Sequence, residues 1–357
     1  MSNKDKVSQA NQKVRRRAGR AQDINIIQSF LDQSTKLLKP KEIVLNLRAK
    51  NSQPNTHLDI GLISREVSIN NATKAVEGKE LRIHNRNRHY KITVASCIET
   101  IKTAHSDLLE KIKVFLQDGV TIICVNELGY PNFTVPSGAT FYELKKQLEL
   151  ADKHFREELV NLAHNHDAII LAGSYHNAKD LKNKAVLFYR NESNGLTPER
   201  FIEHEKLTSA KSENVGEVIR TPSTRQWPIY ITRLGSLAVL ICLDAYDLNV
   251  FFRQMEARFT SGKSRPDIVL VPSYSPKSLH RICQNISYAC NNVVVYVNHA
   301  ATDQKPYSAV YVSGKSIDIS YDVTERIGRA EVSWIERTDL MHKNEIDNID
   351  SIFSELF

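Results

Sequence analysis

The chain has 357 residues, of which 41% are hydrophobic and 25% are charged, as is typical of an ordinary soluble globular protein. No apolar run approaches the ~18 residues that a membrane-spanning helix needs. The basic N-terminus is not followed by the apolar segment of a secretory signal. These features predict a cytoplasmic protein with no membrane partner.

The net charge of +7 is concentrated at the N-terminus. Residues 1–20 hold seven Lys and Arg side chains against Asp5 alone, so this segment carries +6 and the remaining chain only +1. Such a tail can contact nucleic acid or another polyanion. The alternative is a disordered, solubilising leader, and the folded body itself has no nucleic-acid signature.

The cysteines show neither a CxxC pair nor an even number, so they predict reduced thiols rather than a disulfide scaffold. They are Cys97, Cys124, Cys242, Cys283 and Cys290.

Residues 1–56 are predicted to form a basic, partly disordered N-terminal extension with one short helix. That helix covers about 23–38, because Asp23 is a suitable N-cap, apolar residues follow one helical face, and Pro40 ends the pattern.

Residues 57–357 are predicted to form one domain that begins with a strand at 58–64. The polar and basic segment 65–90 is interpreted as an insertion between elements. His84 and His89 lie in it without a carboxylate or cysteine cluster, so we expect a solvated loop rather than a metal site.

From residue 91 onward, β-rich apolar runs alternate with helical patterns. Runs that are apolar on both faces predict an α/β sheet covered by helical layers. No internal repeat or second domain is evident. The predicted strands are 92–98, 120–126, 168–174, 184–189, 236–242, 266–273 and 293–300, and the predicted helices are 106–118 (closed by Gly119), 140–163 and 277–292.

Polar side chains collect at the carboxyl ends of these strands, where α/β proteins gather their ligand-binding groups. Most free cysteines are inert core fillers, but one strand here ends on Cys242, and a neighbouring strand is followed by Glu127. The residues at strand ends are Glu127, Ser174, Tyr175, His176, Cys242, Asp244, Ser273, Tyr274, Asn298 and His299.

The segments ICVNELGYP, FIEHEKLTSAKSE and LAVLICLDAYDL resemble the three signature segments of the nitrilase superfamily of carbon–nitrogen hydrolases. The resemblance covers about residues 57–340 and implies a four-layer α-β-β-α sandwich with no cofactor and no metal. It implies a Glu–Lys–Cys triad of Glu127, Lys206 and Cys242, and the spacings of 79 and 36 residues are similar to those of the family. Family members commonly pack into oligomers, so a homodimer or larger assembly is expected.

Some positions depart from the family pattern. After Cys-x-Asp the family usually has an Arg- or Phe-containing segment, whereas this chain has Ala245, Tyr246 and Asp247. Ser64 stands where the family frequently has glutamine. These departures concern the substrate rather than the reaction.

An auxiliary glutamate often accompanies this triad in the loop after the lysine, and Glu213 fits that place, with Glu217 as a weaker candidate. Either can equally be a solvent-exposed carboxylate. Lys211 is the rival of Lys206, which is preferred because HEKLTS better matches the family's lysine segment.

Aromatic and polar residues near these segments suggest the substrate pocket. The candidates are Tyr130, His176 and Tyr246, with Phe133 as a further aromatic neighbour.

Two further features have ordinary explanations. His164 and His166 lie between a helix and a strand and are not read as metal ligands. The segment 344–357 has apolar residues at helical spacing, so it is predicted to dock on its own domain or to reach across subunits.

The predicted function is hydrolysis of a non-peptide carbon–nitrogen bond, in the first place an amide, through a thioester on Cys242. Glu127 is the general base and Lys206 the cation at the oxyanion, and both are expected to favour the reactive thiolate. The alternatives are a catalytically silent nitrilase-like scaffold and a polyanion-binding protein that acts through residues 1–20.

Overall fold

The structure is a computed structural model, and it describes twelve segments of the chain. They are residues 57–65, 73–76, 80–85, 88–132, 142–176, 182–190, 201–208, 227–260, 266–275, 279–299, 308–323 and 325–333.

Seven described strands form the first large sheet, in the order β15-β16-β1-β5-β6-β7-β8. Strands β1, β5 and β6 run parallel to one another, and the other neighbours pair antiparallel. The strands are β1 (His57–Ile63), β5 (Ile122–Val125), β6 (Ile169–His176), β7 (Asn183–Phe188), β8 (Ile202–Glu205), β15 (Ser320–Asp322) and β16 (Ile327–Ser333).

Six described strands form the second sheet, in the order β14-β13-β12-β11-β10-β9. Here β10, β11 and β12 are parallel, and the flanking strands pair antiparallel. The strands are β9 (Tyr230–Thr232), β10 (Gly235–Val239), β11 (Ile268–Pro272), β12 (Val293–Val297), β13 (Ser308–Val312) and β14 (Lys315–Ile317).

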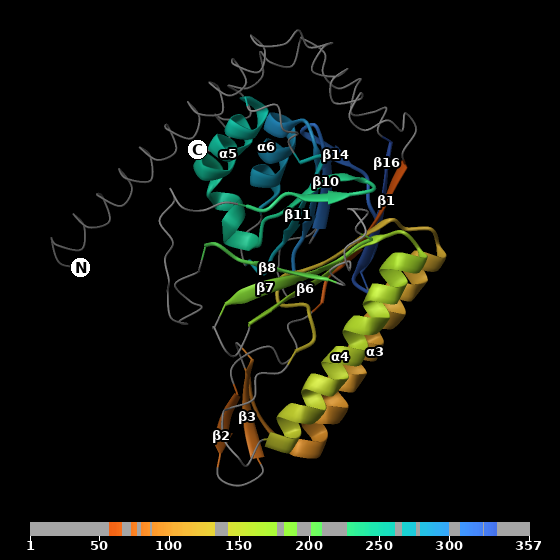
Figure 1. Ribbon diagram of the computed structural model, residues 1–357, viewed down its shortest axis with the longest axis vertical. Coiled ribbons are helices and arrows are strands. Elements are labelled where there is room, and N and C mark those ends of the chain that lie inside the picture. Colours follow the sequence, from red (N-terminus) through yellow and green to blue (C-terminus); the bar gives the residue numbers. More distant parts are fainter. Residues whose placement is uncertain are drawn as a thin grey trace, which may run out of the picture.

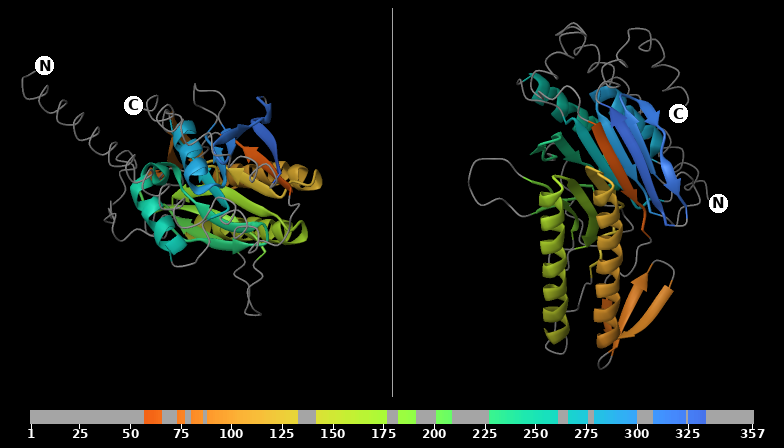
Figure 2. Two further views of the ribbon diagram at one scale, coloured as in Figure 1. Left: turned by 90° about the horizontal axis from the view of Figure 1, so that it is seen from above. Right: turned by 90° about the vertical axis from the view of Figure 1, so that its right-hand side faces the viewer.

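Helices cover the outer face of each sheet (Figures 1 and 2). Helices α3 (Val94–Gln117) and α4 (Tyr142–Asn165) lie side by side on the first sheet, while α5 (Leu248–Thr260) and α6 (His280–Cys290) lie on the second. A separate apolar core fills the space between the two sheets. The predicted four-layer α-β-β-α sandwich is therefore confirmed.

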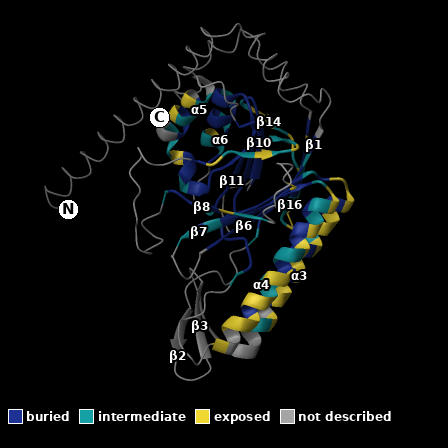
Figure 3. Ribbon diagram, viewed as in Figure 1, coloured by how far each residue is buried: buried dark blue, intermediate teal, exposed yellow. Residues whose placement is uncertain are grey.

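The two-sided burial of the central strands explains their continuous apolar sequences. In β5, Ile122 and Cys124 face the inter-sheet core, whereas Ile123 and Val125 face the helices α3 and α4. Because side chains alternate along a strand, a strand buried on both faces needs apolar residues at consecutive positions. Figure 3 shows this burial across the sheets, in contrast to the exposed outer surfaces of α3 and α4.

The strand predicted at 92–98 is wrong beyond its first two residues. Strand β4 (Arg88–Thr93) ends there, and α3 begins at Val94. The buried positions Ile101, Leu108 and Ile112 recur at helical spacing along α3. This longer apolar stripe outweighs the short β-rich run that precedes it.

The segment interpreted as a loop insertion contains strands instead. β2 (Thr73–Val76), β3 (Glu80–Asn85) and β4 form a three-stranded antiparallel sheet, which lies beside the end of α3 and α4 that is remote from the sandwich (Figure 1). His84 and His89 are register partners in it. Among the described residues, no group of three or more His, Cys, Asp or Glu residues could hold a metal ion.

Several predictions fall outside the described residues: the extension 1–56 with its helix at 23–38, and the C-terminal segment 344–357. Within the described part of the chain, no helix is both long and apolar enough to cross a membrane.

Candidate active site

Glu127, Lys206 and Cys242 come together at one end of the sandwich. Glu127 follows β5 and Lys206 follows β8, both in the first sheet, while Cys242 follows β10 in the second sheet. All three are buried, with exposed fractions of 2%, 8% and 5%. The space between the sheets therefore holds a carboxylate, an ammonium and a thiol from strands that are distant in sequence.

The Glu127 carboxylate accepts hydrogen bonds from three donors. Lys206 Nζ lies 2.7 Å from Oε1, and Asn183 Nδ2 lies 2.8 Å from the same oxygen. The backbone N–H of Tyr274 donates to Oε2 at 2.8 Å. These bonds, one of them from a cationic donor, hold the carboxylate in a single orientation.

The backbone around Glu127 is a tight turn. The residue after it, Leu128, has a φ of +59°, and its N–H donates to Ser174 Oγ on β6 at 3.0 Å. Asn126 Nδ2 donates to the Glu127 carbonyl at 2.9 Å. Gly173, with a φ of +93°, lets β6 pass close to this turn, because a Cβ there would lie 2.9 Å from the Asn126 carbonyl oxygen.

Cys242 begins a short 3₁₀ turn, η4 (Cys242–Tyr246), with a φ of +49°. A left-handed conformation is uncommon for a residue other than glycine and concentrates at functional sites. Here it comes three residues after the end of β10, and the Cys242 thiol lies close enough to the Glu127 side chain and the Tyr274 backbone for both to act on its pKa.

Burial raises the pKa of the Cys242 thiol, and the negative charge of Glu127 raises it further. The positive charge of Lys206 and the hydrogen bond from the Tyr274 backbone oppose this shift without cancelling it. The sequence-based expectation that both charged neighbours favour the thiolate is therefore wrong for Glu127. The resting thiol is neutral, so attack requires a base that removes its proton.

Asp244 links the cysteine turn to the lysine loop, a role that the sequence reading did not assign to it. It is fully buried, and burial raises its pKa to about 7 against the opposing effects of the Lys206 charge and its backbone hydrogen bonds. Its carboxylate accepts bonds from three backbone N–H groups, two of them directly after Lys206 and one directly before Cys242. The donors are Leu207 (3.1 Å), Thr208 (2.7 Å) and Ile241 (3.2 Å).

Asn183 was also missed. Its side chain donates to Glu127, and its carbonyl accepts the backbone N–H of Lys206 at 2.8 Å. Asn183 reaches the site through the antiparallel pairing of β6 with β7, which spacing along the chain does not reveal. This pairing brings the start of β7 to the edge where β5 and β6 end.

No protein-family model matches the chain, and no curated protein matches its sequence. Solved structures do match it, at low identity. The NitFhit protein of Caenorhabditis elegans is 14% identical, with a TM-score of 0.50, over 85% of this chain and 67% of that one. Nit3 of Saccharomyces cerevisiae, a member of branch 10 of the nitrilase superfamily, is 15% identical, with a TM-score of 0.47, over 81% and 96%.

The chain shares its overall fold with the NitFhit protein. A glutamine-dependent NAD+ synthetase from Acinetobacter baumannii also matches, with 13% identity and a TM-score of 0.47 over 79% of this chain. The chain spans only 47% of the length of that synthetase.

The fold does not bring all predicted pocket residues to the thiol. Tyr130 is fully buried in the core that faces α4, and its hydroxyl donates to Asp152 at 2.7 Å. Tyr246 ends the turn that Cys242 begins and is 45% exposed. His176 is the last residue of β6. The candidates Phe133, Glu213, Glu217 and Lys211 lie outside the described residues.

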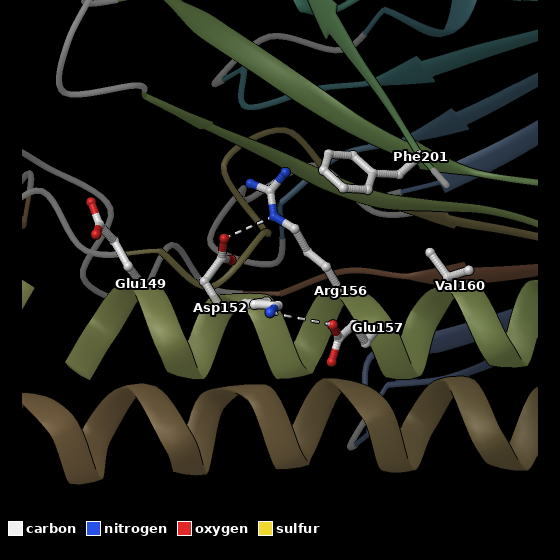
Figure 4. A pocket seen from close by; sticks show the side chains of 7 residues that line it. Glu149, Asp152, Arg156, Glu157, Val160 and Phe201 are labelled. Carbon is white, nitrogen blue, oxygen red and sulfur yellow. Dashed lines mark hydrogen bonds and ion pairs between the residues drawn. The ribbon is translucent and has the colours of Figure 1, made fainter. Parts of the chain in front are cut away.

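A second charged cluster lies on the outer side of the first sheet, in a depression over α4 (Figure 4). Arg156 donates from its three nitrogens to Asp152, Glu203 and the Tyr175 hydroxyl. Its guanidinium also lies over the ring of Phe201, 4.6 Å from the centroid. One guanidinium is shared by two carboxylates in this cluster, and no described nucleophile belongs to it.

Proposed function

We propose that the protein hydrolyses a non-peptide carbon–nitrogen bond, in the first place an amide, through a thioester on Cys242. The observation that carries the proposal is the buried Glu127–Lys206 pair, with 2.7 Å between Nζ and Oε1, set beside a thiol at a left-handed residue. An ion pair that only stabilised the sandwich would need no neighbouring nucleophile.

In the proposed acylation step, Glu127 takes the proton of the Cys242 thiol, and Sγ forms a bond to the amide carbonyl carbon. The carbonyl oxygen becomes an oxyanion, which the Lys206 ammonium and the backbone N–H after Cys242 stabilise. The carbon–nitrogen bond then breaks, and Glu127 passes the proton to the leaving nitrogen, which departs as ammonia or an amine.

In the proposed deacylation step, Glu127 removes a proton from water, and the resulting hydroxide attacks the thioester carbon. The carbon–sulfur bond breaks, the carboxylic acid leaves, and the proton returns to the Cys242 thiolate. One carboxylate thus serves both half-reactions. The raised pKa of the thiol supports this scheme, because it makes a dedicated base necessary.

Ammonia release from a panel of primary amides, ureido acids and nitriles tests the proposal, with Cys242→Ala as the matched control. We expect Cys242-dependent release from at least one amide. Release that persists in Cys242→Ala would contradict the thioester route, and selective release from nitriles would contradict the assignment to amides. A wild-type protein that releases no ammonia from any compound would instead support the catalytically silent scaffold.

A further inference from the structure

The side-chain amide of Asn183 is only half satisfied. Nδ2 donates to Glu127 at 2.8 Å, but Oδ1 is buried and has no hydrogen-bond partner among the described residues. The orientation of the amide is fixed, because the reverse orientation would place Oδ1 against the carboxylate oxygen. The residue as a whole is 6% exposed.

A buried acceptor without a donor is unusual and costs free energy, so it calls for an explanation at each place where it occurs. Lys206 Nζ points to the same Glu127 oxygen that Asn183 Nδ2 contacts. Because no donor within the described part of the chain reaches Oδ1, this oxygen can accept a hydrogen bond from a molecule that enters the site.

The unpaired oxygen is close to where the leaving nitrogen must pass. Along β7, Asn183 alternates with residues of the helix-facing core and shares its side of the sheet with Ala185 and Leu187, which belong to the inter-sheet core. The two heavy atoms of one amide group lie about 2.3 Å apart, so Oδ1 is within about 5 Å of Glu127 Oε1. A nitrogen that receives a proton from Glu127 at about 3 Å can reach Oδ1 as well.

We propose that Asn183 Oδ1 accepts an N–H of the leaving nitrogen, so that the site selects amides with at least one N–H over esters and fully alkylated amides of the same acyl group. This inference rests on the proposed function. Asn183 moves no proton: by holding an N–H it turns the nitrogen lone pair toward Glu127, which delivers the proton as the carbon–nitrogen bond breaks.

The test compares kcat/KM for the best primary amide of the panel with kcat/KM for its methyl ester and its N,N-dimethyl amide. In Asn183→Ala, we expect kcat/KM for the primary amide to fall about 10-fold further than for the other two substrates, the scale of one lost hydrogen bond to a polar substrate group. Asn126→Ala is the matched control, because it also loosens Glu127 but removes no unpaired acceptor. It should lower all three values by one common factor.

Asn183→Asp is the second variant, in case Asn183→Ala does not fold. It keeps an acceptor at this position but places a like charge beside Glu127, so we expect slower reactions with an unchanged amide-to-ester ratio. Equal losses on all three substrates in Asn183→Ala, or the same change of ratio in both variants, would overturn the inference and leave Asn183 as a positioning residue or a water ligand. Absence of Cys242-dependent hydrolysis in the wild type would instead remove the proposed function, and this inference with it.

Discussion

The first sheet carries charged clusters on both of its faces, and strand β8 contributes to both. On the inner face, the Lys206 and Glu127 side chains are 3% and 2% exposed and lie beside the Cys242 thiol. On the outer face, Arg156 is 12% exposed, but its carboxylate partners Asp152 and Glu203 are 26% and 29% exposed. The charged groups of the inner pair have therefore lost more of their contact with water than those of the outer cluster.

Desolvation is costly, and a buried ion pair is weak evidence for stability on its own. In the outer cluster, the Arg156 nitrogens have hydrogen-bond partners, and the carboxylates of Asp152 and Glu203 keep contact with solvent. The inner pair is almost completely shielded from solvent. Beside it lie the neutral Cys242 thiol and the Asn183 amide oxygen, which has no hydrogen-bond partner among the described residues. We infer that the inner arrangement serves chemistry and the outer one serves packing. The variants below test this difference.

The largest effect is expected for Cys242→Ala. Without the sulfur no thioester can form, so turnover of the active amide should fall by about 10³-fold or more. The thermal unfolding midpoint should change little, because the substitution removes only one sulfur atom from a small buried side chain near a strand end. Steady-state ammonia release and circular dichroism on the same preparation measure the two quantities.

Glu127→Gln should reduce kcat by about 10²–10⁴-fold, because an amide can neither take the thiol proton nor return it. The side-chain volume is retained, so the fold should persist. The pre-steady-state burst is the informative measurement. A normal burst followed by slow release would show that Glu127 acts in deacylation only, contrary to the proposed scheme.

Lys206→Met should lower kcat/KM by about 10²-fold, the scale of losing an oxyanion donor. It also leaves the buried Glu127 carboxylate without its cation, which should cost roughly 3–5 kcal/mol of stability. Urea unfolding should therefore show a lower midpoint than for Cys242→Ala. An active and equally stable Lys206→Met variant would contradict both roles.

Asp244→Asn should lower kcat about 10-fold, because the Asn NH₂ group meets backbone donors where a carboxylate accepted them and so loosens the Lys206 loop. The stability effect has a defined sign. The folded pKa of about 7 lies above the ordinary value of 3.8 for an aspartate, so the folded wild type keeps a proton that the unfolded chain loses. Wild-type stability should therefore decline relative to the variant as pH rises from about 4 to 7, by roughly 1 kcal/mol per pH unit.

Chemical unfolding at several pH values between 4.5 and 8 measures this relative slope. Wild-type stability that rises relative to Asp244→Asn as the pH increases would contradict the conclusion that burial raises the pKa of Asp244.

Arg156→Met should have the smallest effect on activity, with kcat/KM unchanged within about 3-fold. It leaves partly exposed carboxylates without their partner, so the expected stability loss is about 1–3 kcal/mol. Unfolding midpoints and kcat/KM are measured together. A loss of activity like that of Lys206→Met would erase the distinction between the two clusters.

The α/β sheet covered by helices could be predicted because its central strands are buried on both faces, which leaves a continuous apolar run in the sequence, whereas the four-layer arrangement was implied only by the resemblance to the nitrilase superfamily. The start of α3 was not predicted correctly, because the short β-branched run at 92–94 is typical of a strand. Only the helical spacing of the buried residues Ile101 and Leu108 indicates that the helix begins at this run. The sheet formed by β2, β3 and β4 was missed because its residues are mostly polar and charged, and register between such strands is weakly specified by local pattern.

Glu127, Lys206 and Cys242 were selected from segments that resemble the nitrilase superfamily, and the structure brings them together. Asp244 accepts hydrogen bonds from backbone N–H groups next to Lys206 and Cys242, and Asn183 is brought to Glu127 by the pairing of β6 with β7. Neither relation can be read from spacing along the chain. Tyr130 follows Glu127 closely in sequence, but the tight turn between them directs it to the opposite face of the sheet. Because of this turn, closeness to Glu127 in the sequence did not identify a residue of the substrate pocket.

The central claim is that Cys242 carries the acyl group, and intact-protein mass spectrometry with a slow amide substrate tests it most directly. The account predicts a transient mass increase equal to the acyl group, which peptide mapping places on Cys242 and which Cys242→Ala lacks. Cys124, Cys283 and Cys290 are buried and should stay unmodified. An adduct on another residue, or an unchanged mass during turnover that Cys242→Ala retains, would contradict the account.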